Sequence, residues 1–125
     1  MSPSARQRSG TAGEELACRF LEAQGYQILT RNFACRSGEV DVIARQDDTT
    51  VFVEVKDRSS SGHGEGYEAV TAGKRARLVR AALIFASKHG LSERPLRFDV
   101  VSIKRTASVP AEIRHDAGAF DADGF

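Results

Sequence analysis

Charged residues interrupt two short apolar segments of this chain. They are Glu39 and Asp41 in the first segment and Glu54 and Lys56 in the second. Carboxylate oxygens are the hard ligands that Mg²⁺ and Mn²⁺ prefer. If folding brings the acids together, they could hold a divalent cation that activates water for phosphodiester hydrolysis. The chemistry therefore depends on how the two segments pair.

The two segments, Gly38–Ala44 and Val51–Lys56, are expected to form an antiparallel hairpin. Both alternate with period two and are rich in β-branched residues, as strands are. The polar residues 46–49 between them suit a turn. A slip of one residue would move carboxylates into the core, so the pairing register is strongly specified.

Side-chain parity gathers the charges on one face of this hairpin. A turn centred between residues 47 and 48 sets Asp41 opposite Glu54 and Glu39 opposite Lys56, with Ile43 opposite Phe52 on the same face. Opposed like charges destabilise a strand pair, so opposed carboxylates favour a cation site. The other face is apolar and is expected to lie in the core. It carries Val40, Val42, Ala44, Val51, Val53 and Val55.

Helix and strand signals predict the elements on either side of the hairpin. A helix is expected to begin at Thr11, with Glu14 completing a capping box, and to stop at Gly25. A strand is expected over residues 26–31, followed by a loop over residues 32–37.

The C-terminal half adds a second helix and a fourth strand. Residues 59–67 are rich in serine and glycine and are expected to be flexible. A helix is expected over about 71–89, with Gly90 just beyond its end, and a strand over 96–103.

These elements give one α/β domain in the order αβββαβ, with a mixed β-sheet flanked by helices. At 125 residues and 41% hydrophobic content the chain can bury a core. We expect a flexible arm over residues 1–9, the domain over 10–105, and an extended or partly disordered tail over 106–125.

Composition limits the class of protein. The chain has no run of the roughly 20 apolar residues that a membrane span requires, and no secretory signal in its first ten residues. We therefore expect a cytoplasmic protein without a membrane partner. Cys18 and Cys35 lack zinc-site spacing and are expected to be free thiols.

Positive charge concentrates in the second helix. The formal net charge is only +1, but the last fourteen residues hold four acids and one base, so residues 1–111 carry +4. Residues 69–92 contain five basic side chains and no acid. Lys74, Arg77 and Arg80 lie on one helical face, which suits either phosphate contact or ordinary solvation. The opposite face is apolar and comprises Leu78, Val79, Ala82, Leu83, Phe85 and Ala86.

The motifs resemble a known family. Asp41, a 12-residue gap and Glu54-Val55-Lys56 resemble the D-(x)n-(D/E)-x-K signature of the restriction-endonuclease-like superfamily. Further motifs extend the likeness over roughly residues 10–103 to the YraN-like family of small uncharacterised bacterial proteins. They are Gly13-Glu14, Gly25-Tyr26-Gln27-Ile28-Leu29, Arg31-Asn32, Gly38-Glu39-Val40-Asp41, Phe52-Val53-Glu54-Val55-Lys56, Arg58, Lys74 and Arg97-Phe98-Asp99-Val100-Val101.

This resemblance implies a restriction-endonuclease-like core related to archaeal Holliday-junction resolvases, with Mg²⁺ or Mn²⁺ as cofactor. Asp41, Glu54 and the Val55 carbonyl would be metal ligands. Lys56 would orient or deprotonate water, or stabilise transition-state charge. The electrostatic role is favoured, because a lysine ordinarily holds its proton to about pH 10.

The sequence leaves two roles open for each of two acids, Glu14 and Glu39. Glu14 matches a resolvase glutamate that approaches the metal, but it equally suits the capping box, and Glu15 is a weaker substitute. Glu39 could pair with Lys56 or lie at the rim of the site.

The resemblance also implies a nucleic-acid partner. Because the chain has only nine aromatic residues, no tryptophan and no alternating aromatic and basic pattern, duplex or branched DNA is the favoured substrate. Arg58 and Lys74 would contact phosphates, together with the basic helix. Residues 59–67, including His63, would close over substrate or form an ordinary surface linker. The analogy makes a homodimer plausible.

Three functions therefore remain open. The first is a Mg²⁺-dependent DNA endonuclease. The second is a non-catalytic nucleic-acid-binding or accessory module that retains the fold. The third is an interaction protein whose acidic hairpin and tail engage a basic partner.

Overall fold

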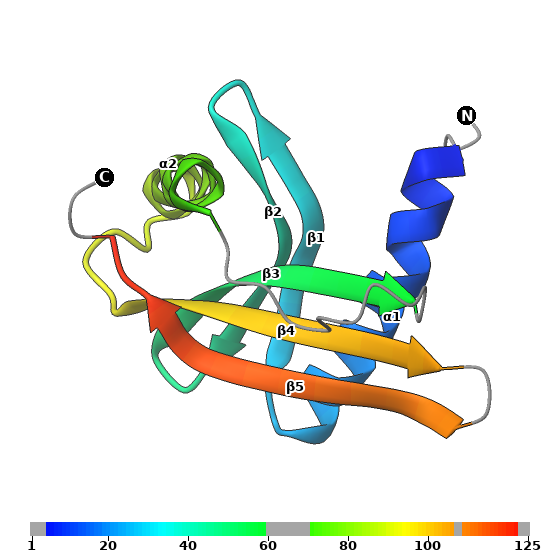
Figure 1. The fold of residues 1–125 in the computed structure, drawn as a ribbon. Coiled ribbons are helices and arrows are strands. Elements are labelled where there is room, and N and C mark those ends of the chain that lie inside the picture. The colour runs from blue at the N-terminus through cyan, green and yellow to red at the C-terminus, as the bar shows by residue number, and fades with distance from the viewer. Residues whose placement is uncertain (1–4, 60–70, 107–108, 123–125) are drawn as a thin grey trace.

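The computed structural model describes residues 5–59, 71–106 and 109–122, which form two helices and five strands (Figure 1). The elements in chain order are α1 (Ala5–Ala23), β1 (Gln27–Cys35), β2 (Gly38–Gln46), β3 (Thr49–Ser59), α2 (Ala72–Lys88), β4 (Leu96–Thr106) and β5 (Val109–Phe120). Neither described helix is both long and apolar enough to cross a membrane.

The strands form one mixed sheet in the order β1-β2-β3-β4-β5. β3 and β4 are parallel and are joined through α2, whereas the other neighbouring strands are antiparallel. The expected mixed α/β fold is confirmed, but the order αβββαβ is wrong by one strand. β5 lies within the segment expected as a tail. This edge strand was missed because its half-buried positions, among them Ala111, Ile113 and His115, include small and polar residues.

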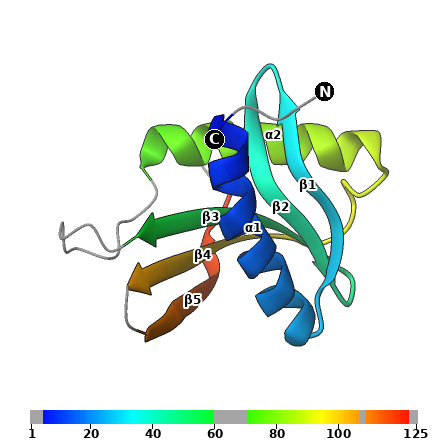
Figure 2. The same ribbon diagram turned by 90° about the vertical axis from the view of Figure 1, so that its right-hand side faces the viewer.

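Two helices cover opposite faces of the sheet (Figure 2). α1 contributes Ala17 and Leu21 to a core with Val42, Ala44, Val51 and Val53, as the apolar face predicted. The other face was expected to be charged, but beyond its acids it carries a second core under α2. That core contains Ile43, Phe52, Leu78, Val79, Phe85 and Phe98.

Val40 belongs to the α2-side core, so its expected place beside Val42 is wrong. Two residues of a flat strand share a face. β1 and β2 instead bend away from β3 and pass between the two helices (Figure 1). This bend turns Val40 towards α2, while Val42 stays beneath α1.

Two expected boundaries in the N-terminal half differ from the structure. α1 begins at Ala5, so it includes part of the expected arm and Thr11 is not its N-cap. β1 continues to Cys35, so most of the expected 32–37 loop is strand. Polar residues hid both extensions, because neither segment shows a clear apolar period.

The boundaries of α2 agree with the sequence signals. Thr71 is the N-cap, and its Oγ1 accepts a hydrogen bond from Lys74 N at 3.2 Å. Gly90, just past the helix, has φ +68°, a conformation that glycine adopts without steric cost. The start of α2 also packs closely on β2, because a Cβ at Gly38 would collide with the Arg77 carbonyl.

Candidate functional site

β2 and β3 separate at the point where the acids lie. Their ladder runs from Gln46↔Thr49 to Val42↔Val53, which confirms the predicted register and the Ile43–Phe52 pair. Asp41 and Glu54 are the next residue on each strand. We call this place the β2–β3 fork. Because backbone pairing stops there, side chains rather than the ladder occupy the space between the strands.

The fork brings Asp41 and Glu54 into direct contact through a carboxyl–carboxyl hydrogen bond. Asp41 Oδ2 also accepts a hydrogen bond from Val55 N at 2.8 Å. The Asp41 side chain thus supplies the Val55 amide with the partner that a neighbouring strand would otherwise provide. Both contacts fix the carboxyl group of Asp41 against β3.

Both acids resist ionisation in this position. Burial, followed by the charge of Glu54, raises the pKa of Asp41 to about 7. Burial also raises the pKa of Glu54, although Lys56 and Lys74 oppose that shift. The fork is therefore short of positive charge, which a bound cation would supply.

A carboxylate pair fits a magnesium site, because Mg²⁺ is commonly held by one or two carboxylates, several waters and substrate phosphates. Among the described residues, no three His, Cys, Asp or Glu side chains gather as a metal-binding group. Asp41 and Glu54 are therefore a two-carboxylate candidate site rather than part of a larger group of such side chains in the described residues.

Glu14 of α1 lies near Asp41. It is only 7% exposed, and its Oε1 accepts a hydrogen bond from Asn32 Nδ2 at 2.8 Å. Burial raises the pKa of Glu14 and the charge of Asp41 adds to the shift, so the two acids share one electrostatic environment. The capping-box interpretation is wrong, because α1 extends upstream of Thr11 and Glu14 bonds to β1 instead.

Glu15 has a different environment from Glu14. Its side chain is 45% exposed and pairs with Arg19 at 3.0 Å and Arg31 at 2.9 Å. These guanidinium groups lower the pKa of Glu15. Glu15 is therefore an ion-paired surface residue, and Glu14 is the better candidate for the site.

Close packing brings α1 to the fork. A Cβ at Gly13 would collide with the Asp57 side chain on β3, so the close approach favours glycine at this position. Asp57 is in turn held by Arg105 of β4, whose Nη2 lies 2.9 Å from Asp57 Oδ2. The contact seats Glu14, the next residue after Gly13, beside the acids of the fork.

Glu39 and Lys56 do not face each other in the β2–β3 ladder. Glu39 pairs with Ala34 on β1, and Lys56 pairs with Ser102 on β4. The predicted opposition is wrong because the fork opens before these residues could pair. Both still act on the site, since the charge of Lys56 lowers the pKa of Glu54 whereas that of Glu39 raises it.

Residues 13–103 match the model of the uncharacterised protein family UPF0102. The chain belongs to this family. A UPF0102 protein of Myxococcus xanthus (strain DK1622) is 46% identical over 121 residues, which is 97% of this chain and 95% of the relative. One from Parafrankia sp. (strain EAN1pec) is 44% identical over 114 residues, 91% of this chain and 97% of the relative.

Family membership confirms the YraN-like resemblance. The matched residues of this UPF0102 protein contain the fork, Glu14 and the start of α2, whereas β5 lies beyond them. The relatives are named only as members of the family, so their names assign no activity.

The basic side chains of α2 lie near one end of the fork. Lys74, Arg77 and Arg80 are at least partly exposed, as predicted for the polar face. The charge of Lys74 reaches Glu54, which places the first turn of α2 beside the acids. Leu83 is 44% exposed, so its expected place in the apolar face is wrong. The side chain of Arg58 and all of His63 lie outside the described residues.

Sequence reasoning missed a buried network that ties β5 to β4. Asp99, fully buried, accepts hydrogen bonds from Arg97 Nε at 2.9 Å, His115 Nε2 at 2.7 Å and Gly118 N at 2.9 Å. Burial opposes ionisation, but these bonds outweigh it and lower the pKa of Asp99 to about 2. Arg97 also donates to the Tyr26 hydroxyl at 2.6 Å. Because these polar groups form hydrogen bonds with one another, we interpret the network as structural.

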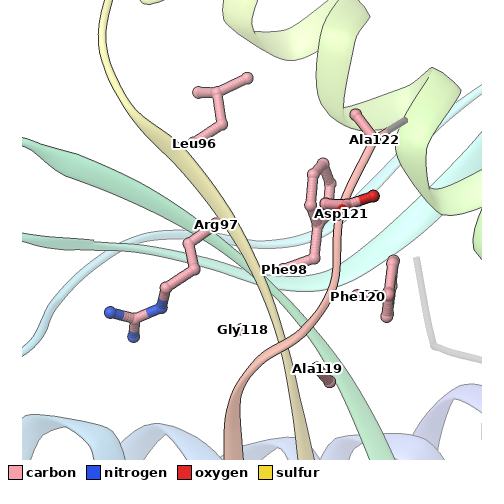
Figure 3. Close-up of a pocket in the computed structure, with 8 residues that line it drawn as sticks. All are labelled: Leu96, Arg97, Phe98, Gly118, Ala119, Phe120, Asp121 and Ala122. Carbon is pink, nitrogen blue, oxygen red and sulfur yellow. The ribbon is translucent and has the colours of Figure 1, made fainter.

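A pocket of about 460 Å³ lies between residues 96–98 of β4 and residues 118–122 at the end of β5 (Figure 3). Phe98 and Phe120 stack within it at 5.4 Å between ring centroids. The pocket includes none of the predicted site residues. The fork, with its unbalanced acids, remains the better candidate for chemistry.

Proposed function

We propose that this protein is a divalent-metal-dependent DNA endonuclease with a restriction-endonuclease-like core. The observation that carries this proposal is the buried contact between Asp41 and Glu54 at the fork, beside the charges of Lys56 and Lys74. Two adjacent buried carboxylates destabilise the empty fold, and such an arrangement is typical of functional sites. Metal-dependent phosphodiester hydrolysis is a function in which such a pair of carboxylates would hold the metal.

Asp41 and Glu54 would hold Mg²⁺ or Mn²⁺, with the Val55 carbonyl as a further ligand. The metal would acidify a bound water and stabilise charge on the phosphoryl oxygens. Asp41 is held by the Val55 amide, so this ligand is oriented before metal binds. Glu14 approaches from α1 and adds negative charge to the same side of the site.

Lys56 would stabilise the charge that develops on the phosphate during attack. It follows two residues after Glu54 on β3, and its charge already reaches that carboxylate. A base role would need a strongly lowered pKa, whereas an ammonium next to acids is favoured in its charged form. Electrostatic stabilisation requires no such change.

The basic face of α2 would bind the DNA backbone. Its Lys74, Arg77 and Arg80 extend from the fork along the helix, where phosphates of a duplex could meet them. Aromatic side chains that could stack on bases are few, because the whole chain has seven Phe, two Tyr and no tryptophan. Duplex or branched DNA therefore suits the protein better than a stacked single strand.

A nucleic-acid-binding module that does not cleave is the second candidate. It is favoured by the absence, among the described residues, of three metal-ligating side chains in one group. A binding module, however, gives no reason to bury opposed carboxylates. The two functions differ in whether metal and acids are needed for a change in the DNA.

The test is a cleavage assay on labelled single-stranded, duplex, flap and four-way-junction DNA with Mg²⁺, Mn²⁺ or EDTA. We expect metal-dependent cutting that Asp41→Asn and Lys56→Ala abolish. Asp48→Asn is the matched control, because Asp48 has a side chain that is 83% exposed, at the hairpin turn. DNA that is bound but left intact by the wild-type protein with every metal would contradict the nuclease and support the binding module.

A further inference from the structure

Asn32 lies within β1 in a backbone conformation that strand residues rarely adopt. Its φ is +55°, in the left-handed region. This conformation costs roughly 1 kcal/mol or more for a residue with a side chain, although asparagine tolerates it better than most. A residue held in this way inside a strand calls for a local cause.

The left-handed residue breaks the alternation of β1. Arg31 pairs with Val42 of the α1-side core, whereas Phe33 pairs with Val40 and packs in the α2-side core. In a regular strand Arg31 and Phe33 would share a face. The change of face at Asn32 lets two successive side chains, those of Arg31 and Asn32, both reach α1.

These two contacts differ in charge. Arg31 Nη1 lies 2.9 Å from Glu15 Oε1 and neutralises that exposed acid. Asn32 Nδ2 donates to Glu14 Oε1 at 2.8 Å through an uncharged amide. An amide donor orients a carboxylate but leaves its negative charge intact. Asn32 thus orients the Glu14 carboxyl group through an uncharged hydrogen bond, whereas Glu15 is held by an ion pair.

Asn32 is also placed directly across from the fork. It lies between the pairs Arg31↔Val42 and Phe33↔Val40, so its position on β1 is opposite Asp41 on β2. Asn32 thus lies opposite the proposed ligand Asp41 in the sheet and is hydrogen-bonded to Glu14 of α1. We propose that Asn32 is a positioning residue that holds Glu14 beside Asp41, from where the Glu14 charge strengthens metal binding by the Asp41–Glu54 pair. This inference rests on the proposed function.

The test is a double-mutant cycle of Asn32→Gly and Glu14→Gln, read by calorimetric titration with Mn²⁺. Glycine accepts the positive φ, so Asn32→Gly removes the amide without straining the backbone. We expect it to weaken Mn²⁺ binding about tenfold, as removal of an outer-shell partner does. In the Glu14→Gln background the same change should have little further effect, because Asn32 acts through Glu14.

Glu15→Gln is the matched control, since it breaks the neighbouring Arg31 ion pair and should leave the Mn²⁺ affinity unchanged. Thermal melting checks that each variant folds. If Asn32→Gly melts early, Asn32→Asp replaces it, because aspartate tolerates the same backbone but repels Glu14. Its cycle with Glu14→Gln must again be non-additive.

The outcomes separate the two proposals. Wild-type affinity in Asn32→Gly, or additive effects in the cycle, would overturn the role of Asn32 while leaving the metal site standing. Failure of the wild-type protein to bind Mn²⁺ would overturn the metal site and the role of Asn32 with it.

Discussion

Asp41 is buried against Glu54, and its pKa is raised to about 7 from an ordinary value of 3.8. The folded protein therefore favours the protonated acid. Near neutral pH the empty fork has an unfavourable interaction that the unfolded chain lacks. A bound cation would reverse this preference, since it stabilises the charged carboxylates.

The first prediction is that Asp41→Asn stabilises the metal-free protein at high pH. Asparagine keeps an oxygen for the Val55 amide and can donate to Glu54, but it carries no charge. Because the folded pKa is raised, stability that involves Asp41 is present below about pH 4 and is lost as pH rises towards 7. The gain should thus be about 1–2 kcal/mol, or roughly 5 °C, at about pH 8 and near zero at about pH 4.

Thermal melting in EDTA at these two pH values measures the effect, with Asp48→Asn as the exposed control. Equal melting temperatures for wild-type and Asp41→Asn at high pH would show that the fork carries no such penalty.

Single residues were predicted with uneven success. Asp41 and Glu54 could be paired from the sequence because the hairpin turn fixes their register over a short distance. The roles of Asn32 and Asp99 depend on residues far along the chain, namely Glu14 for Asn32 and His115 for Asp99. No local pattern of residue types specifies such contacts.

The helices and strands bring the site together through two close approaches, one from each side of the sheet. α1 approaches β3 at Gly13, and α2 approaches β2 at Gly38. The second contact is with the backbone of Arg77, which cannot rotate away. The position of α2 relative to the fork therefore depends on the absence of a side chain at Gly38.

The second prediction is that Gly38→Ala destabilises the protein by about 1–3 kcal/mol, because the added methyl group forces α2 from β2. Gly73→Ala, in the helix that Gly38 contacts, is the control. A Cβ there meets nothing within 4 Å, so alanine should stabilise by up to about 1 kcal/mol through its helix propensity. Urea unfolding of both variants gives the two values. Equal effects would mean that the Gly38 contact is not tight.

The third prediction concerns α2 as a binding element. Replacing Lys74, Arg77 and Arg80 with alanine should weaken DNA binding and reduce the salt slope by about one for each phosphate that the helix no longer neutralises. A triple substitution of Arg94, Lys104 and Arg114 removes the same charge from other parts of the chain and should have less effect. Affinity measured at several salt concentrations distinguishes them. Equal slopes for the two triple variants would make α2 an ordinary solvated surface.

The elements themselves were predictable where local signals were strong. The hairpin turn and the two ends of α2 are encoded within a few residues, so they were predicted correctly. β5 was missed because an edge strand with mixed small and polar residues has little periodicity. The start of α1 was missed because its first residues are polar and a favourable N-cap at Thr11 competed with the true start.

Within the described residues, the fold places the paired acids Asp41 and Glu54 where β2 and β3 separate. The sheet has a core on each face, and the hairpin of β1 and β2 leaves the sheet between α1 and α2 (Figure 1). Asp41 of β2 and Glu54 of β3 are in contact there, Glu14 of α1 lies near Asp41, and the basic start of α2 lies near Glu54. At a net charge of +1 the protein offers little general attraction for DNA, so the DNA binding that we propose would depend on this local arrangement.

Calorimetric titration of Mn²⁺ into the wild-type protein, Asp41→Asn and Asp48→Asn tests the metal site most directly. We expect saturable binding by the wild-type and Asp48→Asn proteins, and an affinity roughly tenfold or more lower in Asp41→Asn, by analogy with ligand-shell substitutions. The same affinity in Asp41→Asn and Asp48→Asn would show that the β2–β3 fork does not bind the metal, and would contradict the proposed site.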